Sequence, residues 1–309
     1  MSALDRESLP PGMHVFERGW LSSNNVLFSD GEQLLLIDSG YCTHAAQTLQ
    51  LVDHALDGRE LDRLVNTHLH SDHCGGNAAL QARYLGLETL IPPGQAASVN
   101  PWDPVALIYS PTGQLCPRFT YSAVIAPGTE MVFGSRIWQA HAASGHDPHS
   151  LLFFEPISQT LISADALWEN GFGVVFPELE GHDAFNDVAV TLDLIEKLRP
   201  KTVIPGHGAV FSYTAKVLDR ARARLDHFVR RPDKHARHAA KVLIKFKLLE
   251  KQQQPVDELI QWAAGTTYLV QICDKFFETE RITDWIEGML DELLISGALT
   301  RKGNLIFNA

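Results

Sequence analysis

Four side chains of metal-ligand type lie within six residues, which makes this segment the most informative part of the sequence. His68, His70, Asp72 and His73 follow the apolar run Leu64 to Thr67 directly. Neutral imidazoles and carboxylates are ligands that zinc, iron and manganese accept in proteins. In an extended segment His68 and His70 share a face, and a tight loop turns Asp72 and His73 toward a neighbouring point. One loop can therefore serve two metal ions.

The alternative interpretation of this segment is a histidine-rich surface loop without a ligand. For a lone histidine, that interpretation is the better one. Here the HxHxDH spacing stands at the end of a hydrophobic strand, and Gly75 and Gly76 permit a close turn into the next helix. The pattern favours a metal site.

The elements that must position this loop alternate between strand and helix patterns. Short β-rich runs separated by turn residues, together with helical periodicity, predict an α/β chain in which two packed sheets are flanked by helices. The stretch 100–118, which holds four prolines, is expected to be a loop or lid. Strands are expected at Asn25–Phe28, Gln33–Asp38, Leu64–Thr67, Tyr121–Ile125, Met131–Phe133, Ile137–His141, Leu151–Phe154, Thr160–Ser163 and Thr202–Ile204, and helices at His44–Leu56 and Ala184–Leu198.

Beyond Tyr213 the pattern is almost wholly helical, with breaks expected at Arg231-Pro232-Asp233 and Gln254-Pro255. Three domains are predicted: a catalytic domain over 1–215, a basic helical connector over 216–254 and a C-terminal domain over 255–309. The last is expected to be winged-helix-like, with helices at Val256–Ala264, Leu269–Phe277 and Thr283–Leu294 and a hairpin from Ala298 to Phe307.

Charge is distributed unevenly along the chain. The formal net charge is -11, yet residues 216 to 251 carry 12 Lys and Arg against four Asp and Glu. The overall sign argues against a surface that attracts nucleic acid or anionic lipid. No apolar run reaches the length of a membrane span, and the four cysteines are far apart in sequence. A cytoplasmic protein that does not associate with membranes is expected.

Five motifs in order resemble the metallo-β-lactamase superfamily over roughly Val15 to Phe211. They are Leu36-Ile37-Asp38-Ser39-Gly40, the HxHxDH run, Ser144-Gly145-His146-Asp147-Pro148-His149-Ser150, Ser163-Ala164-Asp165 and Pro205-Gly206-His207-Gly208. The resemblance implies an αββα sandwich and two divalent metal ions, with zinc expected first and iron or manganese as alternatives. It assigns His68, His70 and His146 to one metal ion, Asp72, His73 and His207 to the other, and Asp165 to both.

The resemblance also implies roles outside the ligand set. Asp38 corresponds to an aspartate that orients the ligand loop, and His149 is expected to lie behind the ligands. Asp72 is the candidate catalytic residue, which would orient the attacking water or move a proton, although a pure ligand role is an equal alternative. Aromatic residues that could line an acyl pocket or simply pack in the core are Tyr41, Trp102, Tyr109, Trp168, Phe172 and Phe176.

The resulting functional hypothesis is hydrolysis of a thioester, or next an ester or lactone, of a small metabolite by a metal-bound hydroxide. The GHDPH run resembles the glyoxalase II form of the motif. The alternative is a phosphodiesterase or single-strand RNA endonuclease, but Thr283 to Leu294 contains four acidic residues and no Lys or Arg, so nucleic acid is not expected as a partner. A regulator without activity and a mononuclear iron oxygenase are further alternatives. The C-terminal domain is expected to serve as a lid or in a homodimer.

Overall fold

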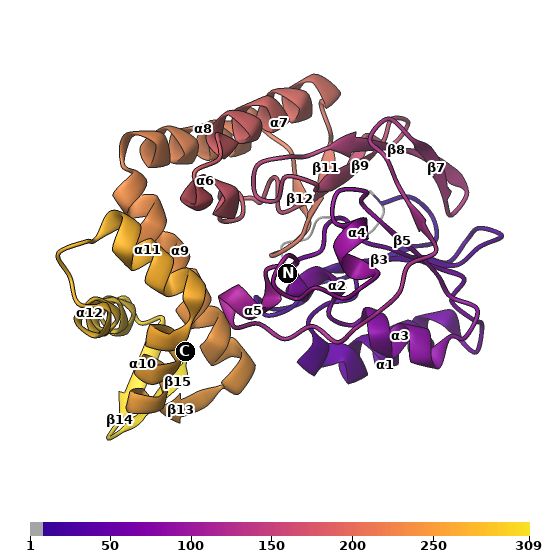
Figure 1. The fold of residues 1–309 in the computed structure, drawn as a ribbon. Coiled ribbons are helices and arrows are strands. Elements are labelled where there is room, and N and C mark those ends of the chain that lie inside the picture. Colours follow the sequence, from indigo (N-terminus) through magenta and orange to yellow (C-terminus); the bar gives the residue numbers. More distant parts are fainter. Residues whose placement is uncertain (1–8) are drawn as a thin grey trace.

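Two six-stranded sheets stacked face to face form the centre of the molecule (Figure 1). The computed structural model describes residues 9–309. The first sheet has the order β1-β2-β3-β4-β5-β6, with the strands at Met13–Phe16, Asn25–Phe28, Leu35–Ile37, Arg63–Val65, Glu88–Ile91 and Ala123–Val124. The second has the order β12-β11-β10-β9-β8-β7, in which β7 to β12 are Glu130–Phe133, Arg136–Ala142, Leu151–Glu155, Thr160–Ala164, Thr202–Pro205 and Phe211–Ser212.

Successive residues of the central strands face two different hydrophobic cores. In β3, Leu35 and Ile37 pack between the sheets, whereas Leu36 packs on the outer side with Val52 and Leu80. Because side chains alternate across a strand, burying both faces requires a continuous apolar run. This explains the sequence Leu-Leu-Leu-Ile at this position.

Helices cover both outer faces of the sheet pair. The helices α1 (Ala45–Leu56) and α3 (Asn77–Arg83) lie on the first sheet, and α7 (Ala184–Leu198) and α8 (Ala215–Arg230) lie on the second (Figure 1). The predicted αββα sandwich is confirmed. Among residues 9–309, no helix is long and apolar enough to cross a membrane.

Some element boundaries differ from the prediction. The strand expected at Leu64–Thr67 ends at Val65, because the Thr67 amide donates to Asp38 Oδ1 instead of a strand neighbour. The strand expected at Tyr121–Ile125 is reduced to the two residues of β6. The expected loop 100–118 contains the one-turn helix α5 (Tyr109–Thr112). Several short elements were not predicted. They are the strands β1, β5, β12 and Gln253–Pro255, the 3₁₀ turn Cys42–His44, α2 (Ser71–Cys74), α4 (Ala96–Val99) and α6 (Phe176–Glu180).

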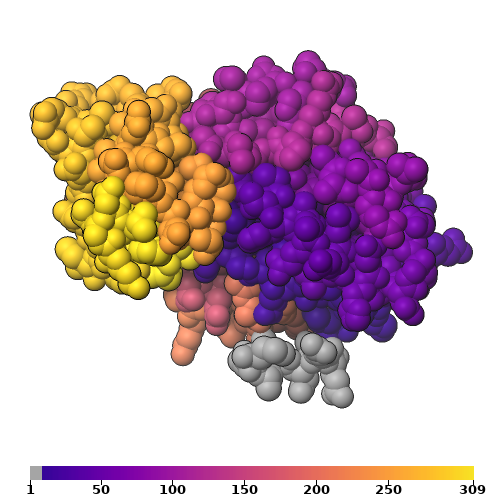
Figure 2. Space-filling model, turned by 90° about the horizontal axis from the view of Figure 1, so that it is seen from below, coloured from indigo at the N-terminus to yellow at the C-terminus, as the bar shows by residue number. Residues whose placement is uncertain are grey.

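The C-terminal part forms a lobe beside the sandwich (Figure 2). The expected helices are present, and the hairpin pairs with a third strand in the order β13-β15-β14. The long helix α9 packs in the same hydrophobic core as these elements. The three-domain division and the winged-helix assignment remain predictions. The elements are α9 (Pro232–Lys251), β13 (Gln253–Pro255), α10 (Val256–Gly265), α11 (Thr267–Phe276), α12 (Ile282–Ile295), β14 (Leu299–Lys302) and β15 (Leu305–Asn308).

Candidate metal centre

The seven predicted ligand residues converge at one edge of the sandwich, on loops that follow strands. The loop after β4 continues into α2 and carries four of them. The connection from β8 to β9 carries His146, and the loops after β10 and β11 carry Asp165 and His207. Because these strands end at the same edge of the sandwich, the loops that follow them bring residues distant in sequence close together.

Three histidines form the first group. His68 Nε2 lies 3.1 Å from His70 Nδ1, which in turn lies 2.8 Å from His146 Nε2. All three rings are buried. Three imidazole nitrogens directed at one another match the donor set of a metal ion better than a hydrogen-bond network, because a neutral imidazole carries only one N–H.

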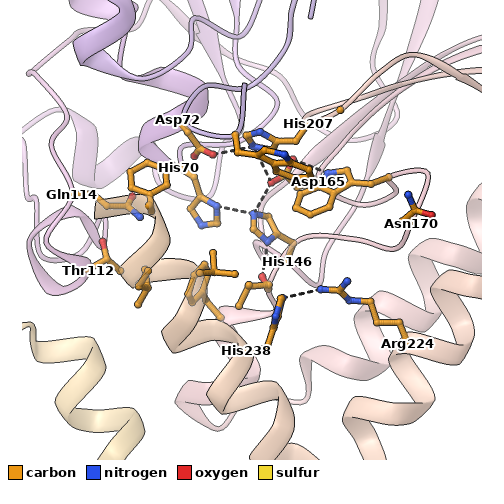
Figure 3. Close-up of a pocket in the computed structure, with 18 of the residues that line it drawn as sticks. His70, Asp72, Thr112, Gln114, His146, Asp165, Asn170, His207, Arg224 and His238 are labelled. Atoms are coloured by element: carbon orange, nitrogen blue, oxygen red, sulfur yellow. Dashed lines mark hydrogen bonds and ion pairs between the residues drawn. The ribbon is translucent and has the colours of Figure 1, made fainter. Parts of the chain in front are cut away.

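The second group combines Asp72, His73 and His207. Asp72 Oδ2 lies 3.0 Å from His207 Nε2, and ligand atoms of all three residues lie within 4.8 Å of one another. Asp165 stands between the two groups. Its Oδ2 is 3.4 Å from His146 Nε2 and 3.8 Å from His207 Nε2, and its Oδ1 is 3.5 Å from His73 Nε2. One carboxylate can therefore reach both groups (Figure 3).

The electrostatics of the two groups fit cations. Burial, with the neighbouring His146, lowers the pKa of His70 to about 4, so its ring is neutral and free to bind a metal. Burial alone would raise the pKa of Asp165, but the facing His207 and His73 rings outweigh it and hold that pKa well below its usual value. The buried His73 Nε2 has no hydrogen-bond partner in the part of the chain that the structure describes. The residues present thus fit two metal ions, and this nitrogen is one of the atoms that would bind a metal.

Asp38 is placed where the sequence predicts it. Its Oδ2 accepts hydrogen bonds from Thr67 Oγ1 at 2.8 Å and from His73 Nδ1 at 2.7 Å, and its Oδ1 accepts the Thr67 amide at 2.9 Å. The bond to His73 leaves Nε2 as the nitrogen available for a metal. Asp38 therefore fixes both the ligand loop and the tautomer of one ligand.

His149 lies apart from the seven side chains. Its ring packs against Gly94 and lines a second cavity on the other side of His70 and His146. The buried residue Asp147 approaches the ligands instead, with Oδ2 3.8 Å from His70 Nε2. The carboxylate beside His146 in the same motif is the signal that could have identified it.

Two tryptophans flank His207. Trp20 stacks on the His207 ring at a centroid distance of 5.6 Å, and Trp168 approaches its edge at 5.5 Å. The Trp168 indole N–H also donates to Asp165 Oδ1 at 3.2 Å. Trp168 thus belongs to the site, as one of the sequence alternatives held, whereas Trp20 was missed because it precedes all the motifs.

The other predicted pocket aromatics divide between cavity and core. Phe176 lines the cavity at the metal centre, which has a volume of about 420 Å³. Trp102 and Tyr109 pack with Phe119 in a hydrophobic cluster, which is the core role that was their alternative. Tyr41 instead donates to Glu250 Oε2 of α9 at 2.9 Å.

Cavity residues outside the seven ligands come from both halves of the chain. The α8 and α9 helices contribute a group that the sequence did not single out: Arg224, His238, Val242, Leu243 and Phe246. Figure 3 shows Arg224 and His238 across the cavity from Asp72 and His207. Only a small part of the basic segment 216–251 therefore lines the cavity.

Cys74, next to His73 in sequence, is not part of either group. Its Sγ lies 3.8 Å from Cys116 Sγ and contacts the Tyr109 hydroxyl at 3.2 Å. Two of the four cysteines, distant in sequence, are therefore neighbours in the fold.

Similarity to known proteins agrees with this geometry. Residues 18–207 match the family model of the metallo-beta-lactamase superfamily. A hydroxyacylglutathione hydrolase from Brucella anthropi is 25% identical over 154 residues, which are 50% of this chain and 47% of that protein. The chain thus matches about half the length of this curated relative.

Two solved structures share the fold. A beta-lactamase domain protein from Burkholderia ambifaria superposes with a TM-score of 0.60 at 20% identity, covering 97% of this chain and 93% of the other. A protein crystallised in a di-iron-bound form superposes with a TM-score of 0.52 at 25% identity, covering 69% of this chain and 98% of the other. The family match spans more than half of the sequence and includes all seven predicted ligand residues. The chain belongs to the metallo-beta-lactamase superfamily.

Proposed function

We propose that this protein is a dinuclear metal-dependent hydrolase that acts on a thioester, or next an ester or lactone, of a small metabolite. The observation that carries the proposal is the position of Asp165, whose two oxygens face both histidine groups at 3.4 to 3.8 Å beside a cavity of about 420 Å³. The partial similarity to a hydroxyacylglutathione hydrolase supports the thioester. Zinc is the first expectation for both positions, with iron and manganese as alternatives.

In this proposal His68, His70 and His146 hold one ion, Asp72, His73 and His207 hold the other, and Asp165 contacts both. Two bound ions would activate water and stabilise the oxyanion that develops on the substrate. The chain's own residues prepare that chemistry. Trp168 and Asp38 hold Asp165 and His73 in place through the bonds described above.

Asp72 is the candidate for proton handling at the reacting edge of the cavity. Burial raises its pKa, but the hydrogen bond from His207 and the nearby His73 outweigh this, so the pKa lies below its usual value and the group is a carboxylate. A carboxylate accepts a hydrogen bond and thereby orients the water or receives its proton. A pure ligand role remains the alternative.

A nucleic acid substrate is not favoured by the charges. The basic segment pairs much of its charge within the protein, since Arg222 contacts Asp193 and Glu196, and Arg237 and Lys241 both contact Glu292 of α12. The phosphodiester alternative therefore has little free positive surface on these helices to attract a phosphate backbone.

The strand order β13-β15-β14 beside α10 to α12 supports the winged-helix-like assignment, with a lid or homodimer role.

The test is release of free thiol from glutathione and coenzyme A thioesters by protein of measured metal content. We expect about two equivalents of metal and turnover that falls at least 100-fold in His70→Ala. The exposed His182, changed to alanine, is the matched control and should leave turnover unchanged. Consumption of oxygen in place of hydrolysis would support the mononuclear iron oxygenase instead. Cleavage of RNA but of no thioester would overturn the proposal in favour of the nuclease alternative.

A further inference from the structure

Arg224 is a charged residue on the buried stripe of an amphipathic helix. On α8 the residues Val217, Ala221 and Phe228 are buried, and Arg224 occupies the position between them at helical spacing. A cation in such a stripe loses hydration, and burial lowers the pKa of Arg224 accordingly. A position of this kind ordinarily holds an apolar residue, so an arginine here needs an interaction that compensates for its lost hydration.

The described part of the chain supplies no anion to balance this charge. Among residues 9–309, no carboxylate forms an ion pair with Arg224, in contrast to the neighbouring Arg222, which contacts Asp193 and Glu196. Its Nη2 donates to His238 Nε2 at 2.8 Å, and its Nε has no hydrogen-bond partner within the described residues. Holding a partly buried guanidinium without a carboxylate costs free energy unless another anion approaches it.

The surrounding residues fix the guanidinium beside the cavity. The rings of Phe172 and Phe228 lie 5.6 and 5.2 Å from its central carbon. Gly171 makes room for the side chain, because a Cβ there would come within 2.8 Å of Arg224 Cδ. The ring of His238, which holds Nη2, is neutral, because burial together with Arg224 lowers the pKa of His238 to about 4. Both residues line the same cavity as Asp72 and Asp165, on its opposite side (Figure 3).

We propose that Arg224, held by His238, binds an oxyanion of the substrate, a carboxylate or a phosphate group, at the end of the cavity remote from the metal groups. Guanidinium groups pair with both oxyanions through parallel N–H donors. Besides Asp72 and Asp165, the cavity lining described by residues 9–309 holds one acidic residue, Glu169, which is exposed and forms no ion pair with the guanidinium. The inference rests on the proposed function and narrows it to acyl substrates that carry a negative charge distant from the scissile carbonyl.

The test measures binding, so that it does not depend on turnover. Three thioethers with the same S-alkyl group, which cannot be hydrolysed, are titrated calorimetrically into the metal-loaded protein. One carries the carboxylates of glutathione, one the phosphates of coenzyme A, and one is the neutral N-acetylcysteamine derivative. We expect one charged thioether to bind at least 10-fold more tightly than the neutral one, and the compound that does so distinguishes carboxylate from phosphate.

Two variants of Arg224 report its role. Arg224→Met should weaken the preferred charged thioether at least 10-fold and leave the neutral one within 3-fold. Arg224→Gln, which keeps a donor for His238 but not the charge, should behave in the same way if Arg224→Met folds poorly. Arg222→Met, two residues along the same helix, is the matched control and should change none of the three dissociation constants.

The outcomes separate the two proposals. Equal weakening of all three thioethers in both Arg224 variants would show a structural role, and a wild-type protein without preference for charge would also overturn the oxyanion site. Binding of a charged thioether through Arg224, combined with no hydrolysis of any thioester, would overturn the proposed function and leave the oxyanion site standing.

Discussion

Asp38 and His73 are joined by a buried hydrogen bond of 2.7 Å between Oδ2 and Nδ1, although 35 residues separate them in sequence. The bond fixes which nitrogen of His73 faces Asp165. Asp38 itself has a positive φ of 57°, a conformation that asparagine also tolerates. The position can therefore be changed in charge without a large change in backbone strain.

Asp38→Asn should lower the metal affinity of the group that contains His73. The amide cannot accept all three hydrogen bonds, so His73 loses its fixed tautomer, and we expect metal affinity to fall about 10- to 100-fold. Metal content after dialysis against a graded series of chelator concentrations measures this. Asp53→Asn, a partly exposed change on α1, is the control. Unchanged affinity in Asp38→Asn would mean that the hydrogen bond only serves folding.

Gly206→Ala should remove the bridging contact of Asp165. A Cβ at Gly206 would overlap Asp165 Oδ1 and approach His73 Cε1 to 3.0 Å, so the carboxylate must move. We expect less than one metal equivalent, against the two proposed for the wild type, by elemental analysis of the folded protein. Gly208→Ala is the matched control, since its Cβ meets no atom of the described residues within 4 Å. Its positive φ of 89° lowers the free energy of unfolding by about 1 kcal/mol without displacing Asp165. Equal metal loss in both variants would contradict the steric argument.

Trp168→Phe should lower turnover more than metal content. Phenylalanine keeps an aromatic ring beside Trp20 and His207 but removes the N–H that reaches Asp165 Oδ1. The loss of one hydrogen bond to a charged group predicts a decrease in kcat/KM of about 10-fold. Steady-state kinetics at matched metal content checks this. Trp20→Phe, which removes no bond to Asp165, should change kcat/KM by less than about 3-fold.

His235 should make stability depend on pH in the acidic range. Burial lowers its pKa to about 3, with His238 and Arg224 contributing, whereas the unfolded chain titrates near the ordinary value of 6.5. The unfolded state therefore binds the extra proton first. The contribution of the neutral ring is complete above pH 6.5 and is lost progressively as the pH falls from 6.5 toward 3.

The free energy of unfolding should fall by about 2 kcal/mol more in the wild type than in His235→Gln between pH 7 and pH 5. Glutamine retains an acceptor for the Val175 amide, which donates to His235 Nε2 at 3.3 Å. Urea unfolding at constant metal concentration gives the two differences. His227→Gln, an exposed position on α8, should retain the wild-type pH dependence, and a parallel shift in both variants would rule out His235 as the cause.

The sequence predicted those parts of the molecule whose signals are local. The HxHxDH run lies directly after a strand. Both faces of β3 are buried, so its sequence is a continuous apolar run, and both features were recognisable. The succession of such segments predicted two packed sheets flanked by helices, and the family resemblance implied the αββα sandwich. Strand boundaries were predicted less accurately where a side chain replaces a strand-to-strand hydrogen bond. At Thr67, for example, the backbone amide donates to the Asp38 carboxylate.

Relationships across long sequence distances could not be predicted. Cys74 and Cys116 become neighbours only when the segment around Tyr109 folds onto α2. His149 and Asp147 are two residues apart, and the turn alone decides which of them faces His70. Arg224 did have a local signal, a charge within the stripe formed by Val217, Ala221 and Phe228, but its meaning depends on the cavity that α9 closes.

Helix α9 belongs to two parts of the molecule at once. His238, Val242 and Phe246 line the cavity, while Ala239 and Leu248 are in the core of the C-terminal lobe, and Leu243 contacts both. Any rotation of this helix that relaxed one set of contacts would disturb the other. Exchanging the lobe for that of a relative would therefore change the shape and charge of the cavity, so that the cavity lining and the C-terminal core would have to evolve together.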